Sequence, residues 1–263
     1  MTRGKPVCCE DMRNDSEGRE PVVNVVSNVR PKRPSKLLDA MRRRAHGGAT
    51  GHLGFGSVPA ESTRRPALVA SLSMVDKAVM EAIGQAGADG IEVVVRGEAD
   101  LAALRSVVSA LPVPVGILLD SAAGWVQASA ADEPDIDWVR LSLQASAVAL
   151  TWEKVARFIT IPEDLELRRI PALNVLEVDA VVIDGAWAQN GGLSIEDALR
   201  LAALGEICKK PIFLNAGPGL SPELVSVAKQ CGIHGLLQQV ELDTAAATVA
   251  AYIEALEASA SRG

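Results

Sequence analysis

Three acidic residues have types and positions that could support acid–base or metal chemistry. Asp120 and Asp184 each follow a run of aliphatic residues, and Glu92 lies inside another such run. If these carboxylates converge, they could bind one divalent cation, or one could act as a general base whose pKa its neighbours raise. An Asp that follows a strand also commonly caps the next helix, so capping stays open for Asp120 and Asp184. We treat all three as candidate catalytic residues.

Polar residues and glycines follow other aliphatic runs and could contact a substrate. These candidate substrate-binding residues are Ser71, Ser73, Arg96, Asn215, Gly217, Gly219 and Gln238. Other chemistries lack their residues at such positions. No Lys follows an aliphatic run where a Schiff base could form, and His46, His52 and His234 lie elsewhere. We therefore expect no Schiff-base enzyme, no metal site built from several histidines and no Ser/His/Asp triad.

Eight short runs rich in Val, Ile and Leu must position these residues, and they recur about every 24 residues, most followed by a helical pattern. An aliphatic run without alternation is typical of a strand buried on both faces, and alternating strands and helices predict a parallel sheet. The predicted strands are Ala67–Leu72, Gly90–Val95, Val115–Asp120, Trp138–Leu143, Arg157–Ile161, Ala180–Asp184, Pro211–Asn215 and Gly235–Gln239.

Eight such units favour an α/β protein with a closed (β/α)8 barrel, known as a TIM barrel, because closure leaves no sheet edge. The alternative is an open doubly wound sheet, but Ser71-Leu72-Ser73-Met74 stands where its glycine fingerprint would lie. In a barrel, Glu92 could instead pair with an interior partner such as Arg96. The predicted helices are 76–85, 100–110, 122–130, 145–154, 165–176 (which Pro171 should kink or split), 194–204, 221–230 and 243–258.

The chain divides by charge into a basic N-terminal extension, residues 1–65, and an acidic barrel, residues 66–263. The extension holds 13 Lys or Arg against 7 Asp or Glu, and the remainder holds 13 against 26. We expect the extension to be largely disordered, with one short helix from about Lys36 to Arg44 that Ser35 caps. No aromatic residue precedes Phe55, so we do not expect a nucleic-acid partner.

The remaining composition bears on the compartment. No apolar run approaches the roughly 20 residues of a membrane helix, and residues 1–10 have no signal-peptide core. The four cysteines form no paired CxxC motifs. We expect a reduced, cytoplasmic protein with no membrane partner.

The stretch PIFLNAGPGLSPELVSVAKQCGIHGLLQQV, residues 211–240, carries the most specific motif. It resembles the strand-seven to strand-eight region of phosphate-binding aldolase-type barrels, such as thiamine-phosphate synthase and the sugar-phosphate epimerases. The resemblance implies a phosphate site in which Gly217 and Gly219 approach the anion. It also departs from that pattern, because Gln238-Gln239-Val240-Glu241 replaces the small turn after strand eight.

These observations lead to two hypotheses. The first is a lyase or isomerase of the aldolase-type barrel superfamily that acts on a small anionic substrate, phosphorylated in the phosphate-binding version. The alternative is a catalytically silent barrel that binds or scaffolds. Residues 181–204 also resemble the strand-six loop of flavin-dependent nitronate monooxygenases, with Gln189-Asn190-Gly191-Gly192 in place of the catalytic His. The cofactor, a metal or flavin included, and a homo-oligomeric state stay open.

Overall fold

Eight parallel strands form a closed barrel in the computed structural model, in the order β1 to β8 with β8 paired to β1. The structure describes residues 35–46, 65–119, 135–185, 187, 192–217, 221 and 225–260, all within the compact unit Lys32–Gly263. Asp120, Gly219, the predicted helix 122–130 and the expected disorder of residues 1–34 and 47–64 lie outside the described residues. In the described part, no helix is long and apolar enough to cross a membrane.

The strands confirm the (β/α)8 prediction. Their bounds are β1 Ala67–Leu72, β2 Gly90–Val95, β3 Val115–Leu119, β4 Ile136–Ser142, β5 Ala156–Pro162, β6 Ala180–Asp184, β7 Ile212–Asn215 and β8 Gly235–Gln239. Each strand begins and ends within two residues of its predicted limits. Aliphatic residues mark these strands because helices cover one face and the barrel interior encloses the other.

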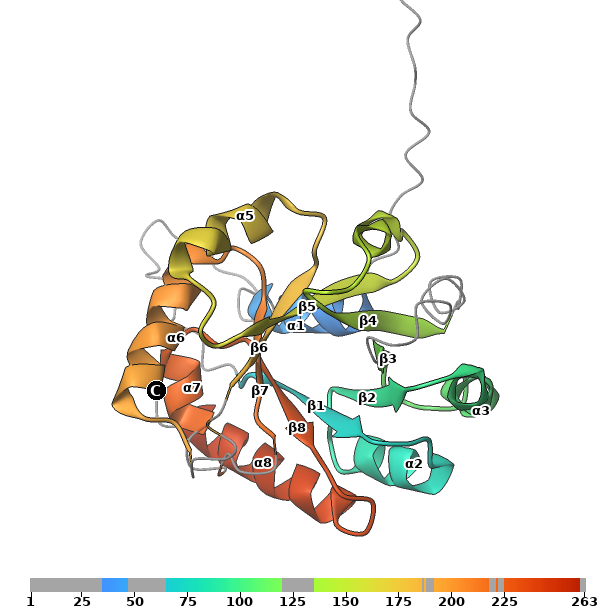
Figure 1. Cartoon of the computed structure of the whole chain (residues 1–263). Coiled ribbons are helices and arrows are strands. Elements are labelled where there is room, and N and C mark those ends of the chain that lie inside the picture. The colour runs from blue at the N-terminus through green and yellow to red at the C-terminus, as the bar shows by residue number, and fades with distance from the viewer. Residues whose placement is uncertain are drawn as a thin grey trace, which may run out of the picture. The chain divides into compact units, whose positions relative to one another are not determined.

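Helices surround the strands on the outside of the barrel (Figure 1). Their bounds are α2 Lys77–Gln85, α3 Glu98–Val108, α5 Ile170–Val175, α6 Ile195–Ile207, α7 Val225–Gln230 and α8 Ala245–Ala260, with 3-10 turns η1 Ala147–Thr151 and η2 Leu167–Arg169. Pro171 lies in the first turn of α5, where its missing N–H costs nothing, so the predicted helix 165–176 divides as expected. The predicted helix 145–154 is only a 3-10 turn.

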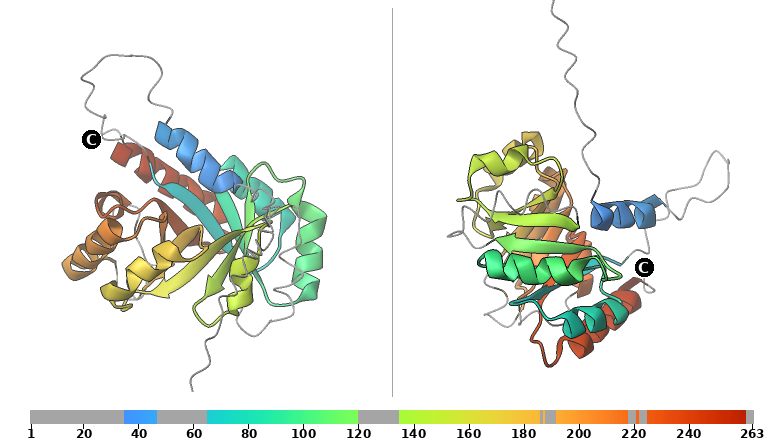
Figure 2. Two further views of the ribbon diagram at one scale, coloured as in Figure 1. Left: turned by 90° about the horizontal axis from the view of Figure 1, so that it is seen from above. Right: turned by 90° about the vertical axis from the view of Figure 1, so that its right-hand side faces the viewer.

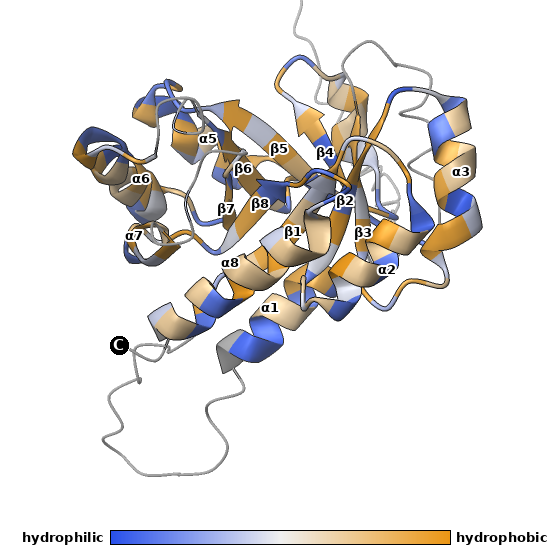
Figure 3. Cartoon of the chain, turned by 90° about the horizontal axis from the view of Figure 1, so that it is seen from below, coloured by the Kyte–Doolittle hydropathy of each residue, from blue (hydrophilic) through white to orange (hydrophobic). Residues whose placement is uncertain are grey.

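Local sequence signals set the starts of two of these helices. Ser194 caps α6 through a capping box in which its side chain and that of Asp197 satisfy each other's backbone N–H groups. Asp76 caps α2 by accepting a hydrogen bond from the N–H of Val79. Hydropathy colouring shows hydrophobic strands and amphipathic helices such as α3 and α6, as expected for helices that pack on a barrel (Figure 3).

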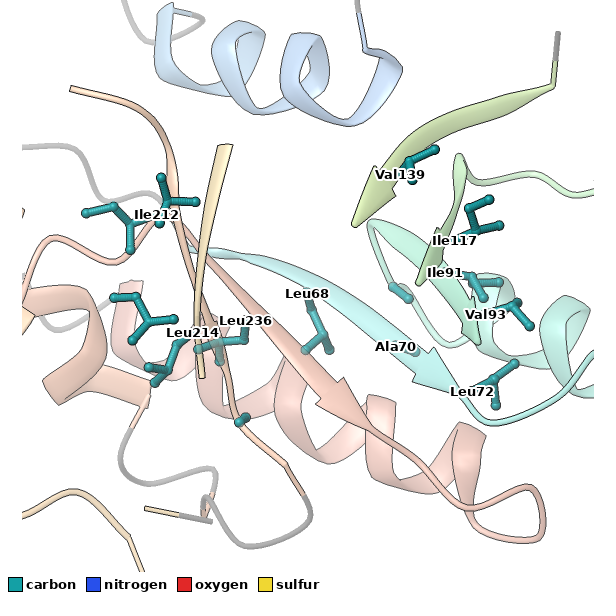
Figure 4. Packing of buried hydrophobic residues seen from close by; sticks show 14 of the residues in the cluster. Leu68, Ala70, Leu72, Ile91, Val93, Ile117, Val139, Ile212, Leu214 and Leu236 are labelled. Carbon is teal, nitrogen blue, oxygen red and sulfur yellow. The ribbon is translucent and has the colours of Figure 1, made fainter. Parts of the chain in front are cut away.

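Alternation along each strand creates two apolar layers. Leu68, Ala70 and Leu72 of β1 point outward into a cluster shared with the surrounding helices, part of which Figure 4 shows. Ala67 and Val69 point into a separate inner cluster with residues such as Trp138 and the phenylalanines of β5 and β7. The Trp138 and Phe158 rings stack at 5.6 Å, and the Phe158 and Phe213 rings lie 5.2 Å apart. The inner layer is therefore a solid aromatic core and not a channel.

A further helix, α1 Lys36–His46, packs across the end of the barrel where the strands begin (Figure 2). Leu37 and Leu38 are buried and belong to the inner cluster. The Asp137 carboxylate accepts hydrogen bonds from the backbone N–H groups of Lys36 at 2.7 Å and Leu37 at 3.0 Å. The predicted short basic helix is therefore present, two residues longer than expected, and it closes the N-terminal end of the barrel.

Candidate functional site

Polar side chains gather at the opposite end of the barrel, where the strands end; we call this end the barrel mouth. Side chains alternate along each strand, so the strand face that carries the inner apolar cluster also carries these polar side chains further along. In the strand register, Ser71 of β1 lies beside Glu92 of β2, and Ser142 of β4 lies beside Thr160 of β5. The inward polar residues at this level are Ser71, Glu92, Arg140, Ser142, Thr160, Asp184, Asn215 and Gln239. In barrels of this fold the active site lies at this end.

Glu92 is the centre of a buried polar network with Ser71 and Arg140. Arg140 Nε donates to Glu92 Oε2 at 3.0 Å, and Arg140 Nη2 donates to Glu92 Oε1 at 2.8 Å. Ser71 Oγ donates to Glu92 Oε1 at 3.1 Å. Glu92 is 0% and Arg140 5% exposed, so both charges depend on this pairing. The expected interior partner of Glu92 exists, but it is Arg140 and not Arg96.

Arg96 occupies a different position because it follows the last residue of β2 and lies outside the barrel interior. Its side chain is exposed, and Nη1 donates to the backbone carbonyl of Ser73 at 3.0 Å. Its backbone N–H donates to Asp100 Oδ2 at 2.8 Å, next to the start of α3. Arg96 and Ser73 therefore connect the two loops that follow β1 and β2.

Asp184 and Asn215 form the second polar pair at the mouth. Asn215 Nδ2 donates to Asp184 Oδ1 at 2.9 Å, and the Asp184 side chain is exposed. The backbone carbonyl of Asn215 accepts a hydrogen bond from Trp187 Nε1 at 2.8 Å, which holds Asn215 from its other side. Asp184 does not cap α6, because Ser194 is the N-cap of that helix. Asp184 is thus a solvent-facing carboxylate that Asn215 orients.

The turn after β7 contains Gly217, and Gly219 lies outside the described residues. Gly217 has a φ of +55°, in the left-handed region that favours glycine. Gln238 is buried and donates from Nε2 to the Gly217 carbonyl at 2.6 Å and to the Gln239 carbonyl at 2.8 Å. On β8, Leu236 faces outward and Leu237 inward, so alternation directs Gln238 outward and Gln239 inward. Gln238 therefore supports this turn from behind.

The candidate site residues from the sequence did not include four polar residues of the mouth: Arg140, Ser142, Thr160 and Gln239. Arg140 could have been found as the only charged residue of the predicted strand Trp138–Leu143. Thr160 Oγ1 is buried and has no hydrogen-bond partner in the part of the chain that the structure describes. Among the described residues, no group of three His, Cys, Asp or Glu side chains could hold a metal ion.

Comparisons with known proteins bear on the fold alone. No protein-family model matches the chain, and no curated protein sequence matches it. Solved structures that match include the tryptophan synthase alpha subunit of Legionella pneumophila, at 11% identity and a TM-score of 0.63 over 86% of this chain and 100% of that one. Tryptophan synthase of M. tuberculosis matches at 15% identity and a TM-score of 0.62, over 86% and 98%.

A mutant alpha subunit (E103A) of tryptophan synthase from Pyrococcus furiosus is a further match, at 13% identity and a TM-score of 0.57 over 73% of this chain and 98% of that one. At such low identity these similarities agree with the (β/α)8 barrel and assign no activity.

Proposed function

We propose that the chain is a lyase or isomerase that acts on a small anionic substrate at the barrel mouth. The observation that carries the proposal is the Asp184–Asn215 pair. An exposed carboxylate at a strand end, held at 2.9 Å by an amide donor, has the placement that a general acid–base group needs. In an eight-stranded barrel β6 lies across from β2, so Asp184 and the buried Glu92–Arg140 pair lie on opposite sides of the mouth.

One exposed positive charge near the mouth supports an anionic substrate. Arg96 is exposed just after β2, whereas the charge of Arg140 is balanced by its buried pair with Glu92. In this proposal Ser71, Ser73 and Arg96 contact the substrate near β1 and β2, and Asn215 does so near β7. Glu92 serves as a second acid–base group once substrate reaches the network, and Asp120 remains a third candidate.

The phosphate-binding version depends on the turn at Gly217. Gln238 ties the Gly217 carbonyl back into the protein, which favours a turn whose N–H groups face the mouth. Backbone N–H groups in such a glycine turn can bind phosphate, and Gly217 and Gly219 would then flank it. Replacing Gly217 by Ala should strain the backbone at φ +55° and weaken binding of inorganic phosphate, measured by calorimetry.

The activity can be tested without a known substrate. The full chain is incubated in D2O with a panel of sugar phosphates and phosphorylated carboxylic acids, and proton NMR follows loss of carbon-bound hydrogen and cleavage products. We expect at least one compound to react. Asp184→Asn should then lower the rate by about 10²- to 10⁴-fold, the usual contribution of a general acid–base group.

Glu81→Gln is the matched control, because it removes an exposed carboxylate on the outer helix α2. A wild-type rate in Asp184→Asn would contradict the proposed role of that residue. Complete absence of reaction across the panel would favour the alternative function, a silent barrel that only binds.

A further inference from the structure

A cavity lies at the other end of the barrel, under α1. Its volume is about 430 Å³, within the usual range for small-molecule sites. Parts of the chain that are distant in sequence build it: α1, the entry to β1 and the entries to β7 and β8. Its lining residues are Leu38, Met41, Arg42, Arg44, Arg65, Pro66, Ala67, Pro211, Lys229, Gly232, Ile233 and His234. We call it the lower pocket.

The lower pocket has an apolar floor and a basic rim. Leu38, Met41 and Ile233 are among the aliphatic residues of the floor. The polar side chains are all basic, three Arg, one Lys and one His, and no Asp or Glu is among the described lining residues. A neutral apolar ligand would not need this rim, and a bare inorganic anion would not use the floor.

Asp89 fixes two of the arginines in place. Its carboxylate is 4% exposed and pairs with Arg44 Nη2 at 2.5 Å and Arg65 Nη1 at 2.7 Å. It also accepts the backbone N–H of Leu68 at 2.8 Å, so its oxygens are already occupied. Two guanidinium groups therefore share one carboxylate, which leaves net positive charge on a preorganised rim.

Lys229 and His234 complete the rim from the β7 and β8 side. Lys229 is in the last turn of α7 and has no ion-pair partner in the described part of the chain. His234 Nδ1 accepts the backbone N–H of Ile212 at 3.2 Å, so Nε2 carries the proton and can donate. Desolvation lowers the pKa of His234, so near neutral pH it is a neutral donor.

We propose that the lower pocket binds a small organic anion that combines an apolar body with one carboxylate or phosphate group. The body contacts Leu38, Met41 and Ile233, and the anionic group binds Lys229 and the guanidinium groups of Arg44 and Arg65. This site is separate from the barrel mouth, so the proposal does not depend on the proposed activity.

The test uses phenyl phosphate and 3-phenylpropionate as probes, titrated into the full chain by calorimetry. Inorganic phosphate lacks the apolar body and benzyl alcohol lacks the charge. We expect both aryl anions to bind, each at least roughly tenfold tighter than these two partial probes. Binding should weaken at high salt, because partly exposed charges are screened.

Variants locate the binding. Lys229→Gln should weaken binding roughly tenfold and Lys229→Glu further, whereas Lys229→Arg should retain it. Lys77→Gln, which removes an exposed Lys of α2, is the matched control and should bind like the wild type. Thermal unfolding of each variant checks that it folds.

Three results would overturn the proposal: no binding of either aryl anion, equally tight binding of benzyl alcohol, or equal affinity of the Lys229→Glu and Lys77→Gln variants. Binding that Gly217→Ala weakens and Lys229→Glu leaves unchanged would assign the probes to the barrel mouth. That result would reject the lower pocket without touching the proposed activity.

Discussion

Ser35 Oγ donates a hydrogen bond to Asp137 Oδ2 at 2.8 Å across 102 residues of sequence. The same Ser35 oxygen accepts the backbone N–H of Leu38 at 3.2 Å, so the residue that caps α1 is itself held by Asp137, the second residue of strand β4. Through this relationship a short basic helix becomes part of the barrel core, since it brings Leu37 onto the inner cluster. The stability of the barrel end therefore depends on one buried carboxylate.

Replacing Asp137 by Ala should destabilise the protein by about 2–4 kcal/mol. The change removes the acceptor for one hydroxyl and two backbone N–H groups, and it leaves buried donors unsatisfied. Urea unfolding measures the loss. Asp135→Ala, at an exposed position just before β4, is the control and should change the free energy of unfolding little. Equal effects of the two substitutions would contradict the role assigned to Asp137.

Removing one partner of the Glu92–Arg140 pair should cost about 3–5 kcal/mol, because the remaining charge is buried and unpaired. The Glu92→Met/Arg140→Met double variant should cost clearly less than the sum of the two single variants. A double-mutant cycle by urea unfolding measures this coupling. The exposed Glu98–Arg105 pair, at the same 2.8 Å, is the control, and its coupling should be about 0–1 kcal/mol. Additive effects at Glu92 and Arg140 would be inconsistent with a buried ion pair.

Gly116→Ala should destabilise the barrel by roughly 1–3 kcal/mol, the usual cost of overpacking a core. A Cβ at Gly116 would lie 2.0 Å from a ring atom of Trp138, which the inner cluster holds in place. Gly97→Ala is the control, since nothing lies within 4 Å of a Cβ there and its φ of −166° is extended. Thermal or urea unfolding compares the two. A Gly116→Ala protein as stable as Gly97→Ala would show that Trp138 can move aside.

The phenol of Tyr252 should ionise late in an alkaline titration. Burial raises its pKa from 10.0 to about 12. Tyr252 is the only tyrosine in the chain, so the phenolate absorbance reports this residue alone. The folded state binds the Tyr252 proton more tightly than the unfolded state does. The contribution of Tyr252 to the free energy of unfolding is therefore fully present below pH 10 and is lost as pH rises towards 12. A midpoint near 10 in the folded protein would contradict the burial of Tyr252, and the denatured chain supplies that reference.

Much of the fold could be predicted from sequence because each strand is a local pattern. The runs at Gly90–Val95 and Ala180–Asp184 are aliphatic over five or six residues and end at turn-forming residues, so their bounds were correct. The prediction of a helix over residues 145–154 was wrong. In this segment between β4 and β5, Ser146 caps a single short 3-10 turn.

The candidate site was predictable only in part. Asp184 and Asn215 are the last residues of their strands, so their meeting at one end of a parallel barrel could be expected. The choice of Arg140 over Arg96 as the partner of Glu92 could not be, because it depends on which side chains face inward two strands away. The lower pocket could not be predicted from the sequence either, because its basic rim comes from separate segments that include α1 and α7.

By itself, the sequence determined the eight strands, their order and the polar character of the strand ends, because hydrophobic periodicity acts over a few residues. Only the tertiary structure decided the pairing of residues far apart along the chain: Glu92 with Arg140 across 48 residues, and Ser35 with Asp137 across 102. The strand register sets the first contact, and the packing of α1 on the end of the barrel sets the second. The register fixes which side chains face inward, and no local pattern encodes which distant residues then share the interior.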